Sequence, residues 1–111
     1  MAYDANTEFS KFEPRLLSPA IGAELLGADL QNFDDTLVKE VRAALLKYQV
    51  VFFRDQHDLT REQHIAFANA FGELEIHPAT PKDQPDTEVL RIAHGPNSKG
   101  QANNWHSDVA W

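Results

Sequence analysis

Hydrophobic positions in the middle of the chain follow the period of an α-helix. The stripe predicts an amphipathic helix over residues 36–48, and its members are Leu37, Val41, Ala44, Leu45 and Tyr48. Asp34, Asp35 and Thr36 lie at its start and offer side-chain oxygens to the free N–H groups of the first turn. We therefore expect a helix that begins at these residues and buries one face.

A second helical pattern lies between Thr60 and Gly72. Thr60 and Gln63 have the spacing of a capping box, and Gly72 fits the position just past a helix C-terminus. The residues on the stripe between them are His64, Phe67, Ala68 and Phe71. For His64 this position favours packing at the core or its boundary over a role as a ligand.

Short apolar runs predict strands. Residues 15–18 and 23–26 are separated by Pro19 and Gly22, which indicates two strands joined by a turn. Residues 50–53 (VVFF) are apolar without alternation, so this strand should be covered on both faces. Arg54 and Asp55 follow it, and we expect a local ion pair between them. A further strand is predicted over residues 89–93.

The remaining segments carry the composition of loops. Residues 1–14 are expected to form a loosely held N-terminal arm, and residues 15–111 to belong to one domain. Residues 73–88 contain three prolines among charged residues, which predicts a long loop of the kind that often carries function. Residues 95–100 should form a turn that leads into a strand around His106.

Composition excludes several classes of function. The net charge of −7 argues against a nucleic-acid or membrane-surface partner, because both present negative charge. The 111 residues contain no cysteine, which excludes disulfides and thiolate chemistry on this stretch. The apolar runs are too short to span a membrane, and the acidic start does not resemble a signal peptide. We expect a soluble, uncleaved, cytoplasmic protein.

The most informative residues are His106 and Asp108. Two apart on an extended strand, they point to the same face about 6.5 Å apart, so both can reach one metal ion. A third ligand would have to come from beyond residue 111. The triplet alone leaves open an ordinary, partly buried histidine beside a surface aspartate.

Longer blocks occur in a fixed order around this pair. They are IGAE and GADL at residues 21–24 and 27–30, VVFFRDQ at 50–56, FGEL with HP at 71–74 and 77–78, and NWHSDV at 104–109. Together they resemble the taurine/alpha-ketoglutarate dioxygenase (TauD/TfdA) family of iron(II)- and 2-oxoglutarate-dependent oxygenases. The resemblance runs from about residue 15 to residue 111.

The resemblance implies a mixed α/β fold, the N-terminal part of a double-stranded β-helix (jelly-roll) with the two amphipathic helices packed on it. It implies His106 and Asp108 as two ligands of Fe(II), with 2-oxoglutarate and O₂ as co-substrates. The third ligand and the arginine that pairs with 2-oxoglutarate lie further downstream in the family. No residue of this chain is therefore expected to hold 2-oxoglutarate directly, and no catalytic residue is expected beyond the ligands.

The substrate residues are also carried over from the family. His77 matches a histidine placed against the substrate's anionic group, and Val109 matches a residue lining the same pocket. A bare loop histidine before Pro78 would otherwise face water. Thr80 and Ala102 stand where the taurine enzyme has a tyrosine and an asparagine that hold taurine, which counts against taurine itself. The run at residues 101–106 is closer to the alkylsulfatase branch.

These features lead to a specific hypothesis. The full-length protein is expected to hydroxylate a small anionic sulfonate or alkyl sulfate ester and to release sulfite or sulfate and an aldehyde. It is expected to form a homo-oligomer, while the 111 residues alone should be inactive. The alternative is a truncated or degenerate, non-catalytic remnant of such a domain, because two ligands alone bind iron poorly.

Overall fold

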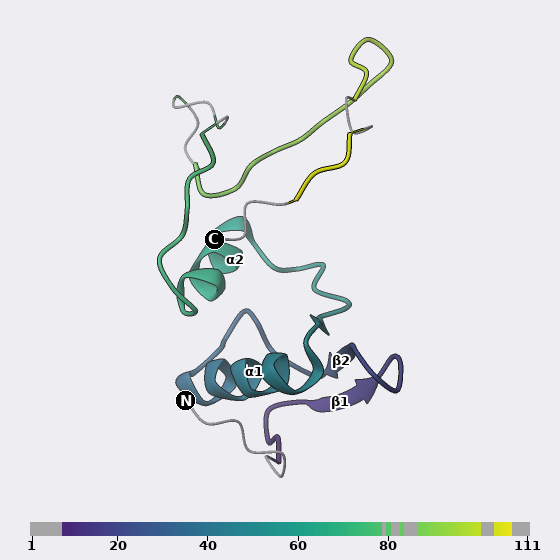
Figure 1. Cartoon of the computed structure of the whole chain (residues 1–111). Coiled ribbons are helices and arrows are strands. Elements are labelled where there is room, and N and C mark those ends of the chain that lie inside the picture. Colours follow the sequence, from purple (N-terminus) through teal and green to yellow (C-terminus); the bar gives the residue numbers. More distant parts are fainter. Residues whose placement is uncertain (1–7, 79, 81–82, 84–86, 101–103, 108–111) are drawn as a thin grey trace. The chain divides into compact units, whose positions relative to one another are not determined.

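The computed structural model describes residues 8–78, 80, 83, 87–100 and 104–107 (Figure 1). The chain divides into two units, Met1–Glu75 and Ile76–Trp111, which are described separately below. The described helices and strands all lie in the first unit, which is a small mixed α/β structure.

Three strands form the sheet of the first unit in the order β1-β2-β3. β1 (Glu13–Leu16) pairs antiparallel with β2 (Ala23–Leu26), and β2 pairs in parallel with β3 (Val51–Phe52). The predicted β1–β2 hairpin is confirmed, although β1 begins two residues earlier than expected. Its Pro14 is tolerated because β1 lies at an edge of the sheet.

The turn between β1 and β2 requires a glycine. Gly22 has a φ of 93°, a left-handed conformation that side chains disfavour, and its carbonyl accepts the Leu17 N–H at 3.0 Å. Its own N–H donates to the Tyr48 carbonyl at 2.9 Å, and the Ala23 N–H donates to Val50 at 3.0 Å. These bonds join the hairpin to the chain that leaves the first helix.

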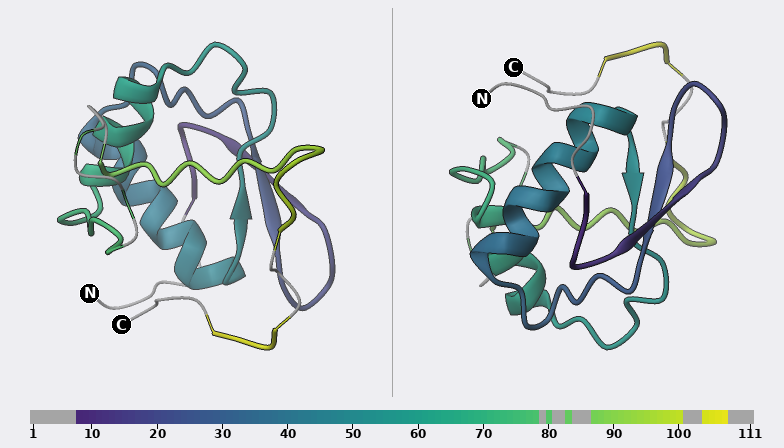
Figure 2. Two further views of the ribbon diagram at one scale, coloured as in Figure 1. Left: turned by 90° about the horizontal axis from the view of Figure 1, so that it is seen from above. Right: turned by 90° about the horizontal axis from the view of Figure 1, so that it is seen from below.

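Helix α1 spans Asp35–Tyr48, which confirms the prediction from the apolar stripe. The Asp34 side chain accepts the Leu37 N–H at 2.8 Å and so caps the helix. Leu37, Val41 and Ala44 are buried, and α1 lies alongside the strands in both views of Figure 2. The core cluster combines this stripe with Ala23 and Leu25 of β2.

Helix α2 spans Arg61–Asn69 and begins with the predicted capping box between Thr60 and Gln63. It ends earlier than expected, with Ala70 as its C-cap, so Gly72 does not take the position just past the helix. His64 is exposed, which corrects its expected place at the core. Only Phe67 is buried, because the helix meets the core through this one ring.

An aromatic cluster surrounds Phe67. The rings of Phe33, Phe53 and Phe71 pack edge-on against it, with centroids 5.3, 5.8 and 5.1 Å away. Such edge-to-face pairs are favoured by the ring quadrupoles. The cluster joins α2 to the core that α1 and the sheet form.

Part of the expected N-terminal arm is packed. Phe12 is buried in the core and stacks on Phe9 with the centroids 4.9 Å apart. Glu40 of α1 accepts hydrogen bonds from the backbone N–H groups of Ser10 and Lys11, at 2.9 and 2.8 Å. Residues 8–14 are therefore anchored to α1, whereas residues 1–7 lie outside the described part.

A buried carboxylate joins the sheet to the segment after β3. Glu24 is only 3% exposed and forms ion pairs with Arg15 of β1 and with Arg54. The expected local pair between Arg54 and Asp55 is therefore wrong. Burial of Glu24 explains this partner, since a buried charge needs a counter-charge more than an exposed aspartate does.

The strand after α1 is shorter and more open than predicted. β3 contains only Val51 and Phe52, and Phe52 is 43% exposed. The expectation of a strand covered on both faces is therefore wrong for the residues that the structure describes. Among the described residues, the side chain of Phe52 thus stays partly open to solvent, although the sequence there is apolar.

The described residues of the second unit form no helix and no regular strand. The predicted strand over residues 89–93 is wrong, because a strand needs a hydrogen-bonded neighbour and Ile92 is 72% exposed. The predicted turn is confirmed by mutual backbone hydrogen bonds between Gly95 and Ser98, at 3.2 and 3.0 Å. Throughout the part that the structure describes, the helices are too short and too polar to cross a membrane.

Candidate metal and substrate residues

His106, the first expected metal ligand, is exposed in the second unit. Its Nδ1 lies 2.9 Å from the carbonyl oxygen of Asn104, two residues earlier. A carbonyl can only accept, so Nδ1 carries the proton and the lone pair of the neutral ring lies on Nε2. A hydrogen bond of this kind, from the ring nitrogen that does not bind the metal, orients a metal-binding histidine, so His106 fits the role.

The strand expected around His106 is not formed by residues 104–107. The local hydrogen bond to Asn104 therefore sets the ring's position without the support of a sheet. Asp108 and Val109 lie outside the described residues. The pairing of His106 with Asp108 stays a prediction. Within residues 8–78, 80, 83, 87–100 and 104–107, no group of three or more histidines or carboxylates could hold a metal.

His77, the expected substrate contact, is also exposed and also belongs to the second unit. Its carbonyl accepts the Thr80 N–H at 2.9 Å, which closes a turn that contains Pro78. The Thr80 hydroxyl is buried and has no hydrogen-bond partner among the described atoms. The turn therefore fixes the backbone of His77.

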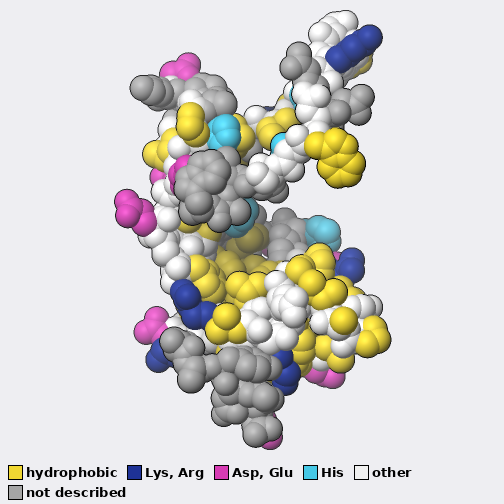
Figure 3. All heavy atoms as spheres, in the orientation of Figure 1, with side chains coloured by type: hydrophobic (Ala, Val, Ile, Leu, Met, Phe, Trp, Pro, Cys, Tyr) yellow, Lys and Arg dark blue, Asp and Glu magenta, His cyan; other side chains and the backbone are white. Residues whose placement is uncertain are grey.

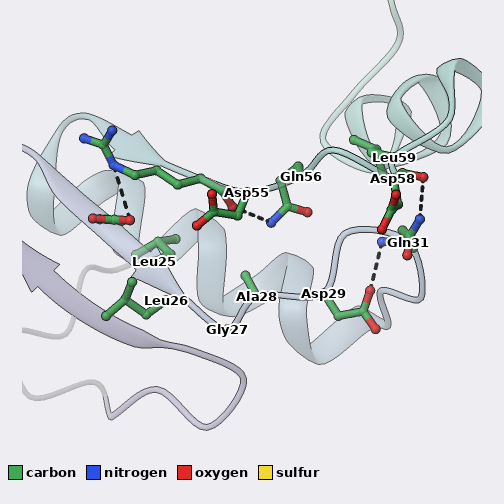
Figure 4. Close-up of a pocket in the computed structure, with 12 residues that line it drawn as sticks. Leu25, Leu26, Gly27, Ala28, Asp29, Gln31, Asp55, Gln56, Asp58 and Leu59 are labelled. Carbon is green, nitrogen blue, oxygen red and sulfur yellow. Dashed lines mark hydrogen bonds and ion pairs between the residues drawn. The ribbon is translucent and has the colours of Figure 1, made fainter.

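A pocket of about 410 Å³ lies in the first unit, between the end of β2 and the segment that leads to α2 (Figure 4). The residues that line it all belong to the first unit, whereas His77 and His106 belong to the second. The polar side chains that line it form hydrogen bonds that hold the surrounding loops together. Gln31 donates to the Asp58 carbonyl at 2.6 Å, and the Gln56 amide donates to the Arg54 carbonyl at 3.0 Å.

Asp29 completes the rim of this pocket as the first residue of a turn. Its carboxylate accepts the backbone N–H groups of Asn32 and Gln31, at 3.1 and 3.0 Å. The hydrogen bonds from Asn32, first from its backbone and then from its side chain, hold the pKa of Asp29 below its ordinary value. The hydrogen bonds of this carboxylate thus stabilise the turn. The spacing of Asp29 and Asn32 is the sequence signal that could have revealed this turn.

Comparison with known proteins relates this chain to oxygenases. The sequence model of the "Taurine catabolism dioxygenase TauD, TfdA family" matches residues 13–111. An alpha-ketoglutarate-dependent sulfate ester dioxygenase of Pseudomonas putida is 36% identical over 93 residues, 82% of this chain and 30% of that protein. The (S)-phenoxypropionate/alpha-ketoglutarate-dioxygenase of Sphingobium herbicidovorans is 36% identical over 105 residues, 90% of this chain and 36% of that protein.

A solved dioxygenase structure is also similar to this chain in fold. The crystal structure of a taurine dioxygenase from Burkholderia xenovorans superimposes with a TM-score of 0.58 and 48% identity. The match covers 64% of this chain and 26% of that one. The chain therefore spans about a third or less of the length of the relatives that it matches.

The described architecture, a small mixed sheet with two helices, is thus the counterpart of one part of a dioxygenase domain. This chain belongs to the TauD/TfdA family, because the family match extends over nearly its whole length.

Proposed function

We propose that the full-length protein is an Fe(II)- and 2-oxoglutarate-dependent dioxygenase that hydroxylates an alkyl sulfate ester or an organic sulfonate. The observation that carries the proposal is the family match over residues 13–111, which includes His77, His106, Asp108 and Val109. The relative in P. putida, named for a sulfate ester, supports this substrate class. A jelly-roll completed by further strands is part of the same proposal.

His106 and Asp108 are proposed as two ligands of the iron. The hydrogen bond from Nδ1 to the Asn104 carbonyl supports His106, since it leaves Nε2 as the coordinating nitrogen. One imidazole and one carboxylate are borderline and hard donors that suit Fe(II). Bound iron supplies the coupling of O₂ reduction to the decarboxylation of 2-oxoglutarate. A third ligand and an arginine for 2-oxoglutarate are expected from other parts of the full-length protein.

His77 is proposed to bind the anionic group of the substrate, with Val109 lining the same pocket. An imidazolium N–H forms charge-assisted hydrogen bonds to a sulfate or sulfonate oxygen. This local donor matters because the chain as a whole is acidic, with a net charge of −7. Hydroxylation of the carbon that bears the sulfate would yield an aldehyde and sulfate, while 2-oxoglutarate becomes succinate and carbon dioxide.

A second substrate class has its own support. The relative in S. herbicidovorans is named for (S)-phenoxypropionate, a carboxylate rather than a sulfate, and matches over 90% of this chain. Both classes present an anion next to an apolar group. The anion contact assigned to His77 therefore serves either class, and an assay must separate them.

The test uses the chain extended in its own reading frame to the length of its relatives. The protein is loaded anaerobically with Fe(II), then given O₂ and 2-oxoglutarate, and succinate is measured with and without each substrate. Succinate stimulated by alkyl sulfates or sulfonates supports the first proposal, and stimulation by aryloxypropionates alone supports the second. No stimulation by either group contradicts both.

The rival hypothesis, a non-catalytic remnant, is tested by the DNA that follows the codon for Trp111. An in-frame histidine and arginine at the spacing of the relatives favour the enzyme, whereas an immediate stop codon favours the remnant. A cytoplasmic location and a homo-oligomeric state remain proposals for the full-length protein. Fractionation and light scattering on that protein would test them.

A further inference from the structure

Arg42 of α1 contacts the residue at which the chain leaves α2. Its Nη2 donates to the carbonyl oxygen of Phe71 at 3.2 Å, and its Cζ lies over the Phe71 ring, 5.8 Å from the centroid. The guanidinium thus meets both the backbone and the ring of one residue, through a charge-assisted hydrogen bond and a cation–π contact. Arg42 therefore ties α1 to the end of α2.

Phe71 is also held from the side of α2. Its ring packs edge-on against Phe67, the buried residue of this helix, with the centroids 5.1 Å apart. Its N–H donates to the Ala68 carbonyl at 3.1 Å. Among the described residues, nothing beyond its chain neighbours lies within 4 Å of a Cβ placed on Gly72. Phe71 is therefore the last residue held by these contacts, and we call it the root of the segment that follows.

The segment that follows the root carries His77. The described residues 73–77 form no helix and no strand, and the next backbone hydrogen bond closes the turn between His77 and Thr80. His77 is the sixth residue after Phe71, and a residue spans at most about 3.6 Å, so a short tether joins the two. Because the tether has no regular hydrogen bonds of its own, any movement of the root passes on to His77.

The contacts of Arg42 differ from those of the other arginines described above. Arg15 and Arg54 form ion pairs with the buried carboxylate of Glu24, whereas Arg42 contacts a carbonyl and a ring. Figure 3 shows lysine and arginine side chains at separate places on the surface of the first unit, so one exposed cation changes the surface charge little. What Arg42 adds is a fixed position for the backbone of Phe71.

We propose that Arg42 is a positioning residue for the substrate histidine. It acts through Phe71, and it keeps the start of the segment that carries His77 in place. This inference rests on the proposed function, because it takes His77 as the group that binds the substrate's anion. It deepens that function by adding a residue of α1 that contacts neither the substrate nor the metal. Arg42 should therefore favour substrate binding and have little influence on turnover.

The first test is a substitution in the full-length protein. Arg42→Met keeps an unbranched side chain against the ring but removes the donor and the charge. It should raise KM for the best substrate of the succinate assay about threefold with kcat nearly unchanged, because the hydrogen bond from His77 is weakened and not lost. Arg42→Lys should restore most of the loss. Lys47→Met is the matched control, since Lys47 lies over Tyr48 of its own helix, 5.5 Å from the centroid, and should leave KM unchanged.

A double-mutant cycle shows whether Arg42 acts through His77. Arg42→Met should have no further effect on KM once His77 is alanine, and additive effects would overturn the proposal. A raised KM in His77→Ala together with an unchanged KM in Arg42→Met would overturn this inference alone. An unchanged KM in His77→Ala would contradict the substrate role of His77, and this inference would fall with it.

A second readout needs neither substrate nor metal. Hydrogen exchange in the full-length protein, followed by mass spectrometry, reports on the N–H groups of Phe71 and Gly72, which both donate to carbonyls of α2. Their exchange should be at least about threefold faster in Arg42→Met than in Lys47→Met, as expected from the loss of one hydrogen bond at the root. Equal exchange in the two variants would show that Arg42 does not hold the root and would overturn the proposal, whatever the substrate is.

Discussion

Glu24 and Arg54 form an ion pair with Oε1 and Nε 3.3 Å apart, although they come from different segments of the chain. Arg15 pairs with the other carboxylate oxygen from the neighbouring strand. The side chain of Glu24 is 4% exposed, whereas those of both arginines are 59% exposed. Only the carboxylate is removed from water. Its charge therefore depends on the ion pairs, whereas the two guanidinium groups remain hydrated.

The difference in exposure predicts that removing both arginines destabilises the protein more than removing the charge of Glu24. Replacing both Arg15 and Arg54 by methionine should cost about 3 kcal/mol of unfolding free energy, because the buried carboxylate then has no counter-charge. Glu24→Gln should cost less, about 1 kcal/mol, since the two exposed guanidinium groups remain hydrated. Urea denaturation of the three proteins measures both values. A larger loss for Glu24→Gln than for the double variant would show that the ordering is wrong.

The capping box of α2 gives a second prediction. The Thr60 hydroxyl accepts the Gln63 N–H at 3.1 Å, and the Gln63 side chain accepts the Thr60 N–H at 2.9 Å. Thr60→Ala should therefore lower stability by about 1 kcal/mol, and Thr60→Ser should restore most of the loss. Denaturation followed by helical circular dichroism checks this. Equal stability of the alanine and serine variants would contradict a role for the hydroxyl.

Glu40 predicts a dependence of stability on pH. Burial tends to raise its pKa, but hydrogen bonds from the Ser10 hydroxyl and from the backbone N–H groups of Ser10 and Lys11 outweigh it. The pKa therefore lies below its ordinary value of 4.5. The unfolded chain binds the proton first as pH falls, so this stabilisation is present above that value and is lost as pH falls through the lower folded pKa.

The matched variant is Glu40→Gln. It should be less stable than the wild type near neutral pH, and its stability should fall less between about pH 6 and pH 3. Unfolding midpoints measured across this range give both slopes. If the unfolding midpoints of the two proteins fell in parallel with pH, Glu40 would not contribute to the loss of stability in acid. The same contacts anchor residues 8–14, so the loss should also expose Phe12.

His77 should affect substrate binding more than turnover. In the full-length protein, His77→Ala is expected to raise KM for an anionic substrate about tenfold with a smaller change in kcat, because it removes one charge-assisted hydrogen bond. His57→Ala is the control, since His57 is an exposed histidine of the first unit. An unchanged KM in His77→Ala would exclude His77 from the substrate pocket.

Local signals in the sequence were sufficient for the helices and the hairpin. The stripe through Leu37 and Val41, the cap at Asp34 and the capping box at Thr60 each depend on residues three or four apart, and the structure confirms them. The partner of Arg54 was beyond such reasoning, because Glu24 is brought to it by strand pairing and not by sequence proximity.

The errors share a physical cause. Residues 50–53 and 89–93 have the apolar character of strands, but a strand forms only where a neighbour supplies hydrogen bonds and cover. β3 pairs with β2 and is short, while the described residues 89–93 have no such neighbour. For the candidate site, the family resemblance named His106 and His77, and the Asn104 contact of His106 could not be read from residue types.

The central claim is that His106 is a ligand of Fe(II), and anaerobic titration of the full-length protein with Fe(II) in the presence of 2-oxoglutarate tests it most directly. The wild type and His57→Ala should each bind one iron per chain. Binding should be at least about tenfold weaker for His106→Ala, since even loss of a residue that only hydrogen-bonds to a ligand weakens metal binding by about that factor. Equal iron affinity in His106→Ala and the wild type would contradict the account.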